Sequence, residues 1–299
     1  MKNRKENYFT KWSMCLLVMF LSVSVYGQKK FSSEIPGKEV KELIYKIVDA
    51  DTLKMELYFP DNVKKNKKYP TIVFYYGGGW NGGTVDQFRD QAGYFASRGM
   101  VTVLVDYRVK SRHDTTPYEA VKDAKSAIRY LKEHAKELHI DNTKMVASGG
   151  SAGGHLAAAV ALLPSVNEST DNLSVNTKVS ALVLYNAVVD NGPGPGGFQH
   201  ERMGEAYLTI SPIHNIEKGA PPTLFILGDK DHLIPVSVAN DYKARMDAVG
   251  SRCEVLIYEG QGHGFFNKRV DTDKYYRITT REVDKFLSSL GYIKGQPTL

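Results

Sequence analysis

Ser151 lies in the stretch Gly149-Gly150-Ser151-Ala152-Gly153, which matches the pattern Gly-x-Ser-x-Gly. A short apolar run precedes this stretch and an alanine-rich run follows it, so we expect the serine at a sharp turn between a strand and a helix. Glycines two residues to either side avoid collisions with the neighbouring strand and helix, and the amides that begin the helix point toward the serine. This context favours a nucleophilic serine for acyl transfer. A phosphate-binding turn is disfavoured, because the stretch lacks both Gly-x-Gly-x-x-Gly and the lysine of a phosphate-binding loop.

A nucleophilic serine requires a base within hydrogen-bond reach and an acid that fixes the tautomer of that base. Asp231 lies in the loop after an apolar run at 223–227, and His263 lies between two glycines in the loop after a run at 254–258. Because the carboxyl ends of parallel strands share one edge of a sheet, both loops are expected beside the serine. We predict His263 as the base and Asp231 as the acid, with Asp229 and then Asp190 as the alternatives.

The other histidines fit less well as the base. His155 is expected to point along the helix after the serine, and His232 neighbours the acid. Three more stand in polar or helical contexts, namely His113, His134 and His139. The last two, His200 and His214, lie in a long segment where they can contact substrate.

The oxyanion of an acyl-transfer intermediate needs donors besides the amide of Ala152, which follows the serine. The stretch Tyr75-Tyr76-Gly77-Gly78-Gly79-Trp80 follows another apolar run, and its three glycines allow the backbone to approach a scissile carbonyl closely. We expect this loop to supply the second donor. Trp80 is also compatible with ordinary packing.

The elements that position these residues follow a regular alternation. Short runs rich in β-branched and aromatic residues predict strands at 43–48, 53–59, 71–76, 101–105, 144–147, 181–185, 223–227 and 254–258. Helical patterns occupy 85–98, 118–138, 152–163, 236–249 and 274–290. The sequence therefore predicts a doubly wound, mostly parallel α/β sheet of about eight strands with helices on both faces, and the first hairpin as an antiparallel edge.

The connection at 187–222 is too long and too rich in Gly and Pro for a simple crossover helix. Long loops in compact domains often form lids or binding loops, so we predict a small cap over the carboxyl edge of the sheet. A disordered surface excursion is the alternative.

Residues 1–27 have the pattern of a secretory signal peptide, with four basic residues, an apolar run at 14–25 and a small residue at Gly27. The apolar run is short for a bilayer span, although a retained N-terminal anchor is the alternative. We therefore predict a secreted or periplasmic protein with no membrane association after cleavage, and one domain over residues 28–299.

Composition excludes several other classes. The first 27 residues carry four of the 39 basic and one of the 33 acidic residues, so the remainder has a formal net charge of only +3. This charge is too small to indicate a protein that binds nucleic acid. Cys253 is the single cysteine beyond the predicted signal peptide, so no disulfide can form within the mature chain. Oligomeric state leaves no signal in the sequence.

Four stretches together carry a resemblance to a known family: YYGGGW at 75–80, GGSAGGHLAA at 149–158, GDKDHLIPV at 228–236 and GQGHGFF at 260–266. They resemble the α/β-hydrolase esterases of the hormone-sensitive-lipase-like and acetyl-xylan or feruloyl esterase type, over nearly all of residues 40–290. The resemblance implies an α/β-hydrolase fold with a Ser151, His263 and Asp231 triad. It also implies an oxyanion hole from the amides of Gly78, Gly79 or Trp80 with that of Ala152.

One residue departs from the family pattern. The family usually has His-Gly-Gly-Gly, and Tyr76 stands where that histidine braces the loop. A tyrosine hydroxyl can form hydrogen bonds from a different distance, which leaves the choice of loop amides open.

We therefore expect a secreted serine carboxylesterase that hydrolyses short-chain acyl esters. The expected acyl groups are acetyl or feruloyl groups on carbohydrate, and the substrate is a small molecule or a polysaccharide. The chemistry requires neither a metal nor an organic cofactor. A serine peptidase or lipase on the same fold remains an alternative, as does a non-catalytic binding protein that keeps the fold.

Overall fold

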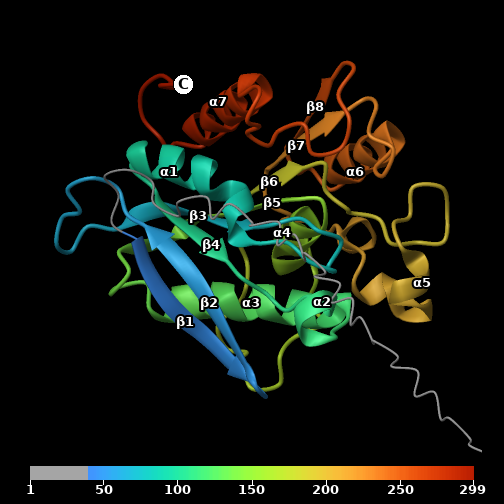
Figure 1. Cartoon of the computed structure of the whole chain (residues 1–299), viewed down its shortest axis with the longest axis horizontal. Coiled ribbons are helices and arrows are strands. Elements are labelled where there is room, and N and C mark those ends of the chain that lie inside the picture. Colours follow the sequence, from blue (N-terminus) through green and yellow to red (C-terminus); the bar gives the residue numbers. More distant parts are fainter. Residues whose placement is uncertain (1–39) are drawn as a thin grey trace, which may run out of the picture. The chain divides into compact units, whose positions relative to one another are not determined.

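A computed structural model of the chain describes residues 40–299, in which eight strands form one mixed sheet in the order β1-β2-β4-β3-β5-β6-β7-β8 (Figure 1). The strands are β1 (Val40–Val48), β2 (Asp51–Tyr58), β3 (Tyr69–Tyr75), β4 (Val101–Val105), β5 (Ile140–Gly150), β6 (Ala181–Tyr185), β7 (Thr223–Gly228) and β8 (Cys253–Tyr258). The predicted signal peptide at 1–27 lies outside the described residues.

The helices connect these strands. They are α1 (Arg89–Ser97), α2 (Lys110–His113), α3 (Pro117–Glu133), α4 (Ala152–Leu162), α5 (His200–Met203), α6 (Val236–Ala248) and α7 (Lys274–Ser289), with 3-10 helices η1 (Val85–Phe88), η2 (Glu205–Thr209) and η3 (Pro212–Asn215). The segment 187–222, predicted as a cap, connects β6 to β7 and carries α5, η2 and η3.

Strand directions follow the prediction. The strands β4, β3, β5, β6, β7 and β8 pair in parallel, whereas β1 pairs with β2 and β2 with β4 antiparallel. The predicted eight-stranded α/β sheet with an antiparallel hairpin at one edge is confirmed. As a result the loops that follow β3, β5, β6, β7 and β8 all leave the same edge of the sheet, which is where the sequence placed the site.

Both faces of the sheet are covered by helices, because the strands are apolar on both sides. Val73 and Tyr75 of β3 belong to one buried cluster with α3, α4 and α6, while Ile72 and Phe74 belong to a second cluster with α1 and α7. In Figure 1, α1 and α7 lie on one side of the sheet and α3 on the other. The alternation along β3 is the two-residue period of a strand that is buried on both faces.

Some boundaries differ from the sequence prediction. Helix α3 begins at Pro117 because Thr116 and Glu119 form a capping box, and it ends at Glu133 rather than at residue 138. Strand β5 begins at Ile140, which pairs with Tyr69 across a register irregularity that no periodicity indicates. The short helix α2 was not predicted.

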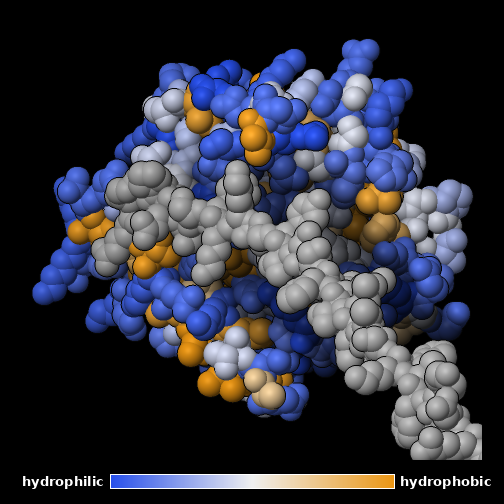
Figure 2. Space-filling view, viewed as in Figure 1, coloured by the Kyte–Doolittle hydropathy of each residue, from blue (hydrophilic) through white to orange (hydrophobic). Residues whose placement is uncertain are grey.

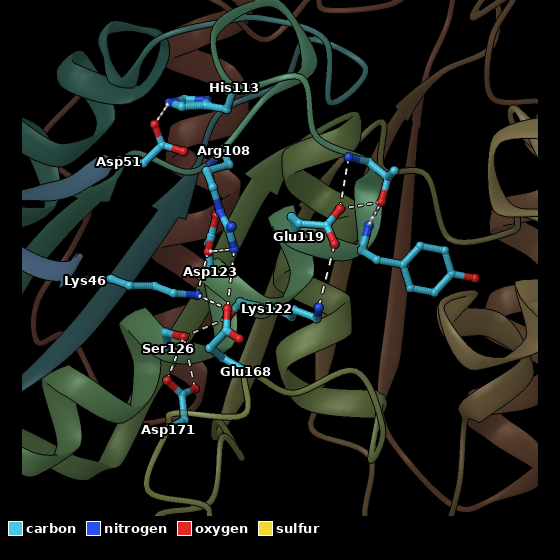
Figure 3. A network of polar contacts seen from close by, with 12 residues as sticks. Lys46, Asp51, Arg108, His113, Glu119, Lys122, Asp123, Ser126, Glu168 and Asp171 are labelled. Carbon is cyan, nitrogen blue, oxygen red and sulfur yellow. Dashed lines mark hydrogen bonds and ion pairs between the residues drawn. The ribbon is translucent and has the colours of Figure 1, made fainter. Parts of the chain in front are cut away.

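A buried charge network fixes the sheet edge to helix α3 (Figure 3). The carboxylate of Asp123 on α3 accepts hydrogen bonds from Lys46 Nζ of β1 at 2.7 Å and from Arg108 Nε and Nη2, each at 2.8 Å. The ammonium of Lys46 also donates to Glu168 at 2.9 Å. Two cations thus face two carboxylates, and the loop after β4 that carries Arg108 is held in place.

The face shown in Figure 2 is mainly hydrophilic, with apolar side chains in several small groups. Lys64, Lys65, Lys67 and Lys68 are exposed in the loop between β2 and β3, as the sequence indicated. Among residues 40–299, no helix has the length and apolar character needed to cross a membrane.

Replacement of Asp123 is expected to destabilise the fold strongly. Asp123→Asn leaves Lys46 and Arg108 buried with only Glu168 as a counter-charge, and such a loss costs about 3–5 kcal/mol of unfolding free energy. Urea unfolding monitored by circular dichroism measures the change. The matched control is Asp247→Asn, because Asp247 pairs with Lys243 on the solvent-exposed side of α6, where a single ion pair contributes little to stability. Equal losses in the two variants would contradict a structural role for the network.

Candidate active site

Ser151 lies at a sharp turn with a strained backbone. Strand β5 ends at Gly150 and α4 begins at Ala152, so Ser151 stands between them with φ 54° and ψ −120°. This region is unfavourable for a residue with a side chain and costs of order 1–3 kcal/mol. The turn is held because the amide of Ser151 donates to the carbonyl of Tyr185 at the end of β6, at 2.9 Å.

Glycine is required on both sides of the serine. A Cβ at Gly153 would lie 2.0 Å from the carbonyl oxygen of Tyr75, and one at Gly149 would lie 2.7 Å from the same oxygen. No side chain fits at these distances, so the pattern Gly-x-Ser-x-Gly lets the turn press against the end of β3. The predicted strand-turn-helix context of Ser151 is present.

Asp231 and His263 lie against each other. Nδ1 of His263 is 2.7 Å from Oδ2 of Asp231. Asp231 as a residue is 8% exposed, and its Oδ1 accepts hydrogen bonds from the amides of Leu233 at 2.9 Å and Ile234 at 3.0 Å. Burial acts to raise the pKa of Asp231, but the hydrogen bonds from His263, Ile234 and Leu233 outweigh it and hold that pKa below its usual value. The ionised carboxylate favours a proton on Nδ1 and a lone pair on Nε2.

The two alternative acids are engaged elsewhere. Asp229 accepts a hydrogen bond from the amide of Gly260 at 2.6 Å. Asp190 accepts from the amide of Gly192 at 2.7 Å and lies 4.0 Å from His214, within segment 187–222. Neither carboxylate contacts His263.

Ser151 and His263 reach the same strand end. The amide of Ser151 donates to the carbonyl of Tyr185, the last residue of β6. Asn186 follows Tyr185, and its Nδ2 lies 3.3 Å from Nε2 of His263. The side-chain oxygen of Asn186 also accepts a hydrogen bond from the amide of Gly264 at 3.2 Å. Within residues 40–299 the Ser151 hydroxyl makes no hydrogen bond. Catalytic hydrogen bonds in resting structures are often long and shorten when substrate binds. The structure therefore joins acid and base directly, and both the serine and the base lie next to the end of β6.

Sequence reasoning missed Asn186 and Gln87. Asn186 is the first residue after β6, and a polar residue at that shared edge is the signal that could have found it. Gln87 lies in η1, and its Oε1 accepts from the amide of Gly77 at 2.6 Å. Nothing in the local pattern at residues 85–88 indicates that contact.

The loop Gly77–Trp80, here called the glycine loop, passes beside the serine. A Cβ at Gly77 would lie 3.4 Å from Cβ of Ser151 and 2.9 Å from the carbonyl oxygen of Gly150. Gly78, Gly79 and Trp80 have φ of 132°, 63° and 56°. The amides of these three residues donate to no acceptor in the described part of the chain. The Ala152 amide opens α4, where amides lack intrahelical partners.

Tyr76, which directly precedes the glycine loop, is held by several polar contacts. Its hydroxyl donates to Asp106 Oδ1 at 2.6 Å and accepts from Arg112 Nη2 at 2.7 Å. Its ring stacks on Tyr107 with centroids 4.2 Å apart, and the Tyr107 hydroxyl donates to the carbonyl of Tyr76 at 2.6 Å. Burial, and then Asp106, raise the pKa of the Tyr76 hydroxyl, so that it remains a donor. The loop after β4 therefore braces the glycine loop.

His155 has a structural place. It is fully buried in the first turns of α4, and its Nε2 donates to the carbonyl of Ile210 at 2.8 Å, which ties α4 to segment 187–222. Its ring meets the edge of Trp80 with centroids 5.0 Å apart. Burial lowers the pKa of His155 to about 4, although the bond to Ile210 opposes the shift. Among residues 40–299 no group of three or more His, Cys, Asp or Glu is arranged to hold a metal ion.

The sequence model of the BD-FAE family matches residues 55–246. The chain belongs to the BD-FAE family. Apo esterase 2 of Thermogutta terrifontis superimposes with a TM-score of 0.82 at 39% identity, over 88% of this chain and 98% of that one. This BD-FAE chain thus has the predicted α/β-hydrolase fold.

Curated relatives of the BD-FAE chain are also esterases. Esterase LipC of Mycobacterium tuberculosis is 30% identical over 220 residues, which are 67% of this chain and 54% of LipC. Carboxylesterase NlhH of the same species is 34% identical over 131 residues, 43% of this chain and 40% of NlhH. The chain spans about half the length of the curated relatives it matches. The resemblance to α/β-hydrolase esterases is confirmed.

Protonation of His155 is expected to destabilise the fold in acid. Its pKa is lowered from 6.5 to about 4, so the contribution to the unfolding free energy is complete above pH 6.5 and is lost as the pH falls toward 4, by about 3 kcal/mol in all. His155→Gln keeps a donor for Ile210 without a titrating ring. Urea unfolding at pH 7 and pH 4 should show a smaller acid loss in this variant than in the wild type. The same loss in both proteins would contradict the prediction.

Removal of the Tyr76 hydroxyl is expected to impair ester hydrolysis. Tyr76→Phe loses the bonds to Asp106 and Arg112 that brace the glycine loop, so kcat should fall about tenfold with KM nearly unchanged. Steady-state kinetics with 4-nitrophenyl acetate measure the change. Tyr130→Phe on α3, whose ring stacks on His134, is the control. A kcat equal to that of the control would show that the hydroxyl does not support the loop.

Proposed function

We propose that the chain is a serine carboxylesterase, with Ser151 as nucleophile, His263 as base and Asp231 as acid. The observation that carries most weight is the 2.7 Å bond between His263 and Asp231 at the sheet edge that also holds Ser151. Esterase names among the relatives and structural neighbours support the same activity. These three groups are the parts that acyl transfer through a serine requires.

In the first half of the reaction, Nε2 of His263 takes the proton of Ser151 as Oγ attacks the acyl carbonyl. Asp231 stabilises the imidazolium that forms and holds its orientation. The tetrahedral intermediate collapses, the alcohol leaves with the proton from His263, and the acyl group stays on Ser151. Water then attacks the acyl-enzyme with His263 again as base, which releases the acid and restores the serine.

Backbone amides stabilise the oxyanion in this proposal. The Ala152 amide lies at the start of α4, where the helix dipole also favours negative charge. The glycine loop contributes the amides of Gly78, Gly79 or Trp80, which have no other acceptor in residues 40–299. Each donor of this kind contributes a factor of about 10²–10³ to kcat.

The substrate is proposed to be a short-chain acyl ester. Esterase 2 of Thermogutta terrifontis, which is 39% identical to this chain in both structures, has been solved with propionate bound and with butyrate bound. Segment 187–222 is polar and carries only short helices, so it offers no long apolar lid of the kind a lipase needs. We propose acetyl esters first and feruloyl esters second, on carbohydrate, hydrolysed after export directed by residues 1–27.

Loss of the nucleophile gives the direct test. Ser151→Ala should lower turnover of 4-nitrophenyl acetate by at least about 10³-fold without changing the melting temperature, because the reaction loses its covalent step. Ser169→Ala, in an exposed loop, is the control. A rate for Ser151→Ala equal to that of the control would refute the assignment.

A second experiment separates the alternatives. A fluorophosphonate probe should label Ser151, whereas a non-catalytic binding protein would leave the serine unmodified. Release of acetate from acetylated xylan is compared with the cleavage of feruloyl esters, peptides and long-chain esters. Faster cleavage of peptides or of long-chain esters would favour a peptidase or a lipase over the proposed short-chain esterase.

A further inference from the structure

Arg202 connects segment 187–222 to the glycine loop. It lies on α5, and its Nη1 donates to the carbonyl of Gly79 at 2.7 Å. The guanidinium carbon lies 5.7 Å from the centroid of the Trp80 ring. Arg202 forms no ion pair with a carboxylate among residues 40–299, and burial lowers its pKa, with Glu201 opposing the shift. A partly buried cation is therefore bonded to the backbone that is proposed to bind the oxyanion.

The bonded carbonyl belongs to Gly79, which lies inside the glycine loop with φ 63°. A Cβ at Gly79 would have no atom within 4 Å, so the space beside its Cα is open. The peptides on either side are held by other backbone groups: Asn81 donates to the carbonyl of Gly78 at 2.9 Å, and Lys110 donates to that of Trp80 at 3.0 Å. Within the described residues, Arg202 is the one group bonded to the carbonyl of Gly79.

Fixing this carbonyl fixes the Trp80 amide, because both groups belong to one peptide unit. Peptide units are planar and trans here, so the Gly79 carbonyl and the Trp80 N–H point in opposite directions. A cationic donor holds the carbonyl more firmly than a neutral one and polarises the whole peptide, which strengthens the N–H at its other end. Trp80 also has φ 56°, a conformation that a bulky residue keeps only where its surroundings impose it.

We propose that Arg202 is a positioning residue for the oxyanion hole. By holding the Gly79 carbonyl from α5, it sets the orientation of the Trp80 amide before substrate arrives, and so makes segment 187–222 part of the catalytic apparatus. This inference rests on the proposed esterase function. It predicts that loss of the guanidinium weakens binding of the transition state and leaves binding of the ground state nearly unchanged.

The test compares three variants with the wild type. Arg202→Met keeps aliphatic packing against Trp80 but removes the donors, Arg202→Lys keeps one cationic donor, and Glu201→Gln changes an exposed neighbour on the same helix. With 4-nitrophenyl acetate, kcat of Arg202→Met should fall about 10- to 100-fold with KM within about twofold of the wild type. Arg202→Lys should recover part of the loss, and Glu201→Gln should match the wild type.

Binding of a boronic acid gives a second readout. Phenylboronic acid forms a tetrahedral adduct with a nucleophilic serine, so its Ki for Arg202→Met should rise by the same factor by which kcat/KM falls. A merely structural contact would not produce this correspondence. Rates are compared well below the melting temperature of each variant, and are normalised to the serines titrated by a fluorophosphonate.

The outcomes separate the two claims. An active wild type with unchanged kcat and boronate affinity in Arg202→Met would overturn the role of Arg202 alone. A rise in KM with constant kcat would overturn it in favour of a substrate contact. A wild type without esterase activity, and with no effect of Ser151→Ala, would refute the proposed function and this inference together.

Discussion

The site depends on one close approach, in which the turn between β5 and α4 presses against the end of β3. Gly149 and Gly153 leave no room for a Cβ beside the Tyr75 carbonyl, and the strained backbone of Ser151 is held by its bond to Tyr185. Because the glycine loop starts directly after β3, the same contact sets that loop beside the serine. One steric requirement thereby aligns the proposed nucleophile with its proposed oxyanion donors.

The rest of the structure holds this contact from three sides. The loop after β4 braces Tyr76, and the buried network around Asp123 anchors that loop to α3. Asn186 supports the loop that carries His263. Segment 187–222 reaches the site through His155 on one side and Arg202 on the other. Elements distant in sequence therefore hold the backbone groups of the site in place. A strained turn requires such support, because it persists only where the surrounding structure imposes it.

Sequence reasoning found what short-range patterns encode. Apolar runs of about five residues predicted the strands and their mostly parallel directions, and the position of Asp231 and His263 after β7 and β8 placed them at one edge. Sequence reasoning missed Gln87, Asn186 and Arg202, because each forms its contacts with a residue of another element. Hydrophobic periodicity indicates which side chains are buried, but not which residues they contact. The early start of β5 was missed for the same reason, since Ile140 joins the strand only through its pairing with Tyr69.

The central claim is that Ser151, His263 and the glycine loop act on one acyl group. Paraoxon transfers a phosphoryl group to activated serine hydroxyls, so its adduct would report where the proposed nucleophile and oxyanion donors lie. A crystal structure of the paraoxon adduct is predicted to show phosphorus on Ser151 Oγ and its oxygen within about 3 Å of the amides of Ala152 and the glycine loop. It is also predicted to show Nε2 of His263 facing Ser151. An unmodified Ser151, or a phosphoryl oxygen directed away from these amides, would contradict the account.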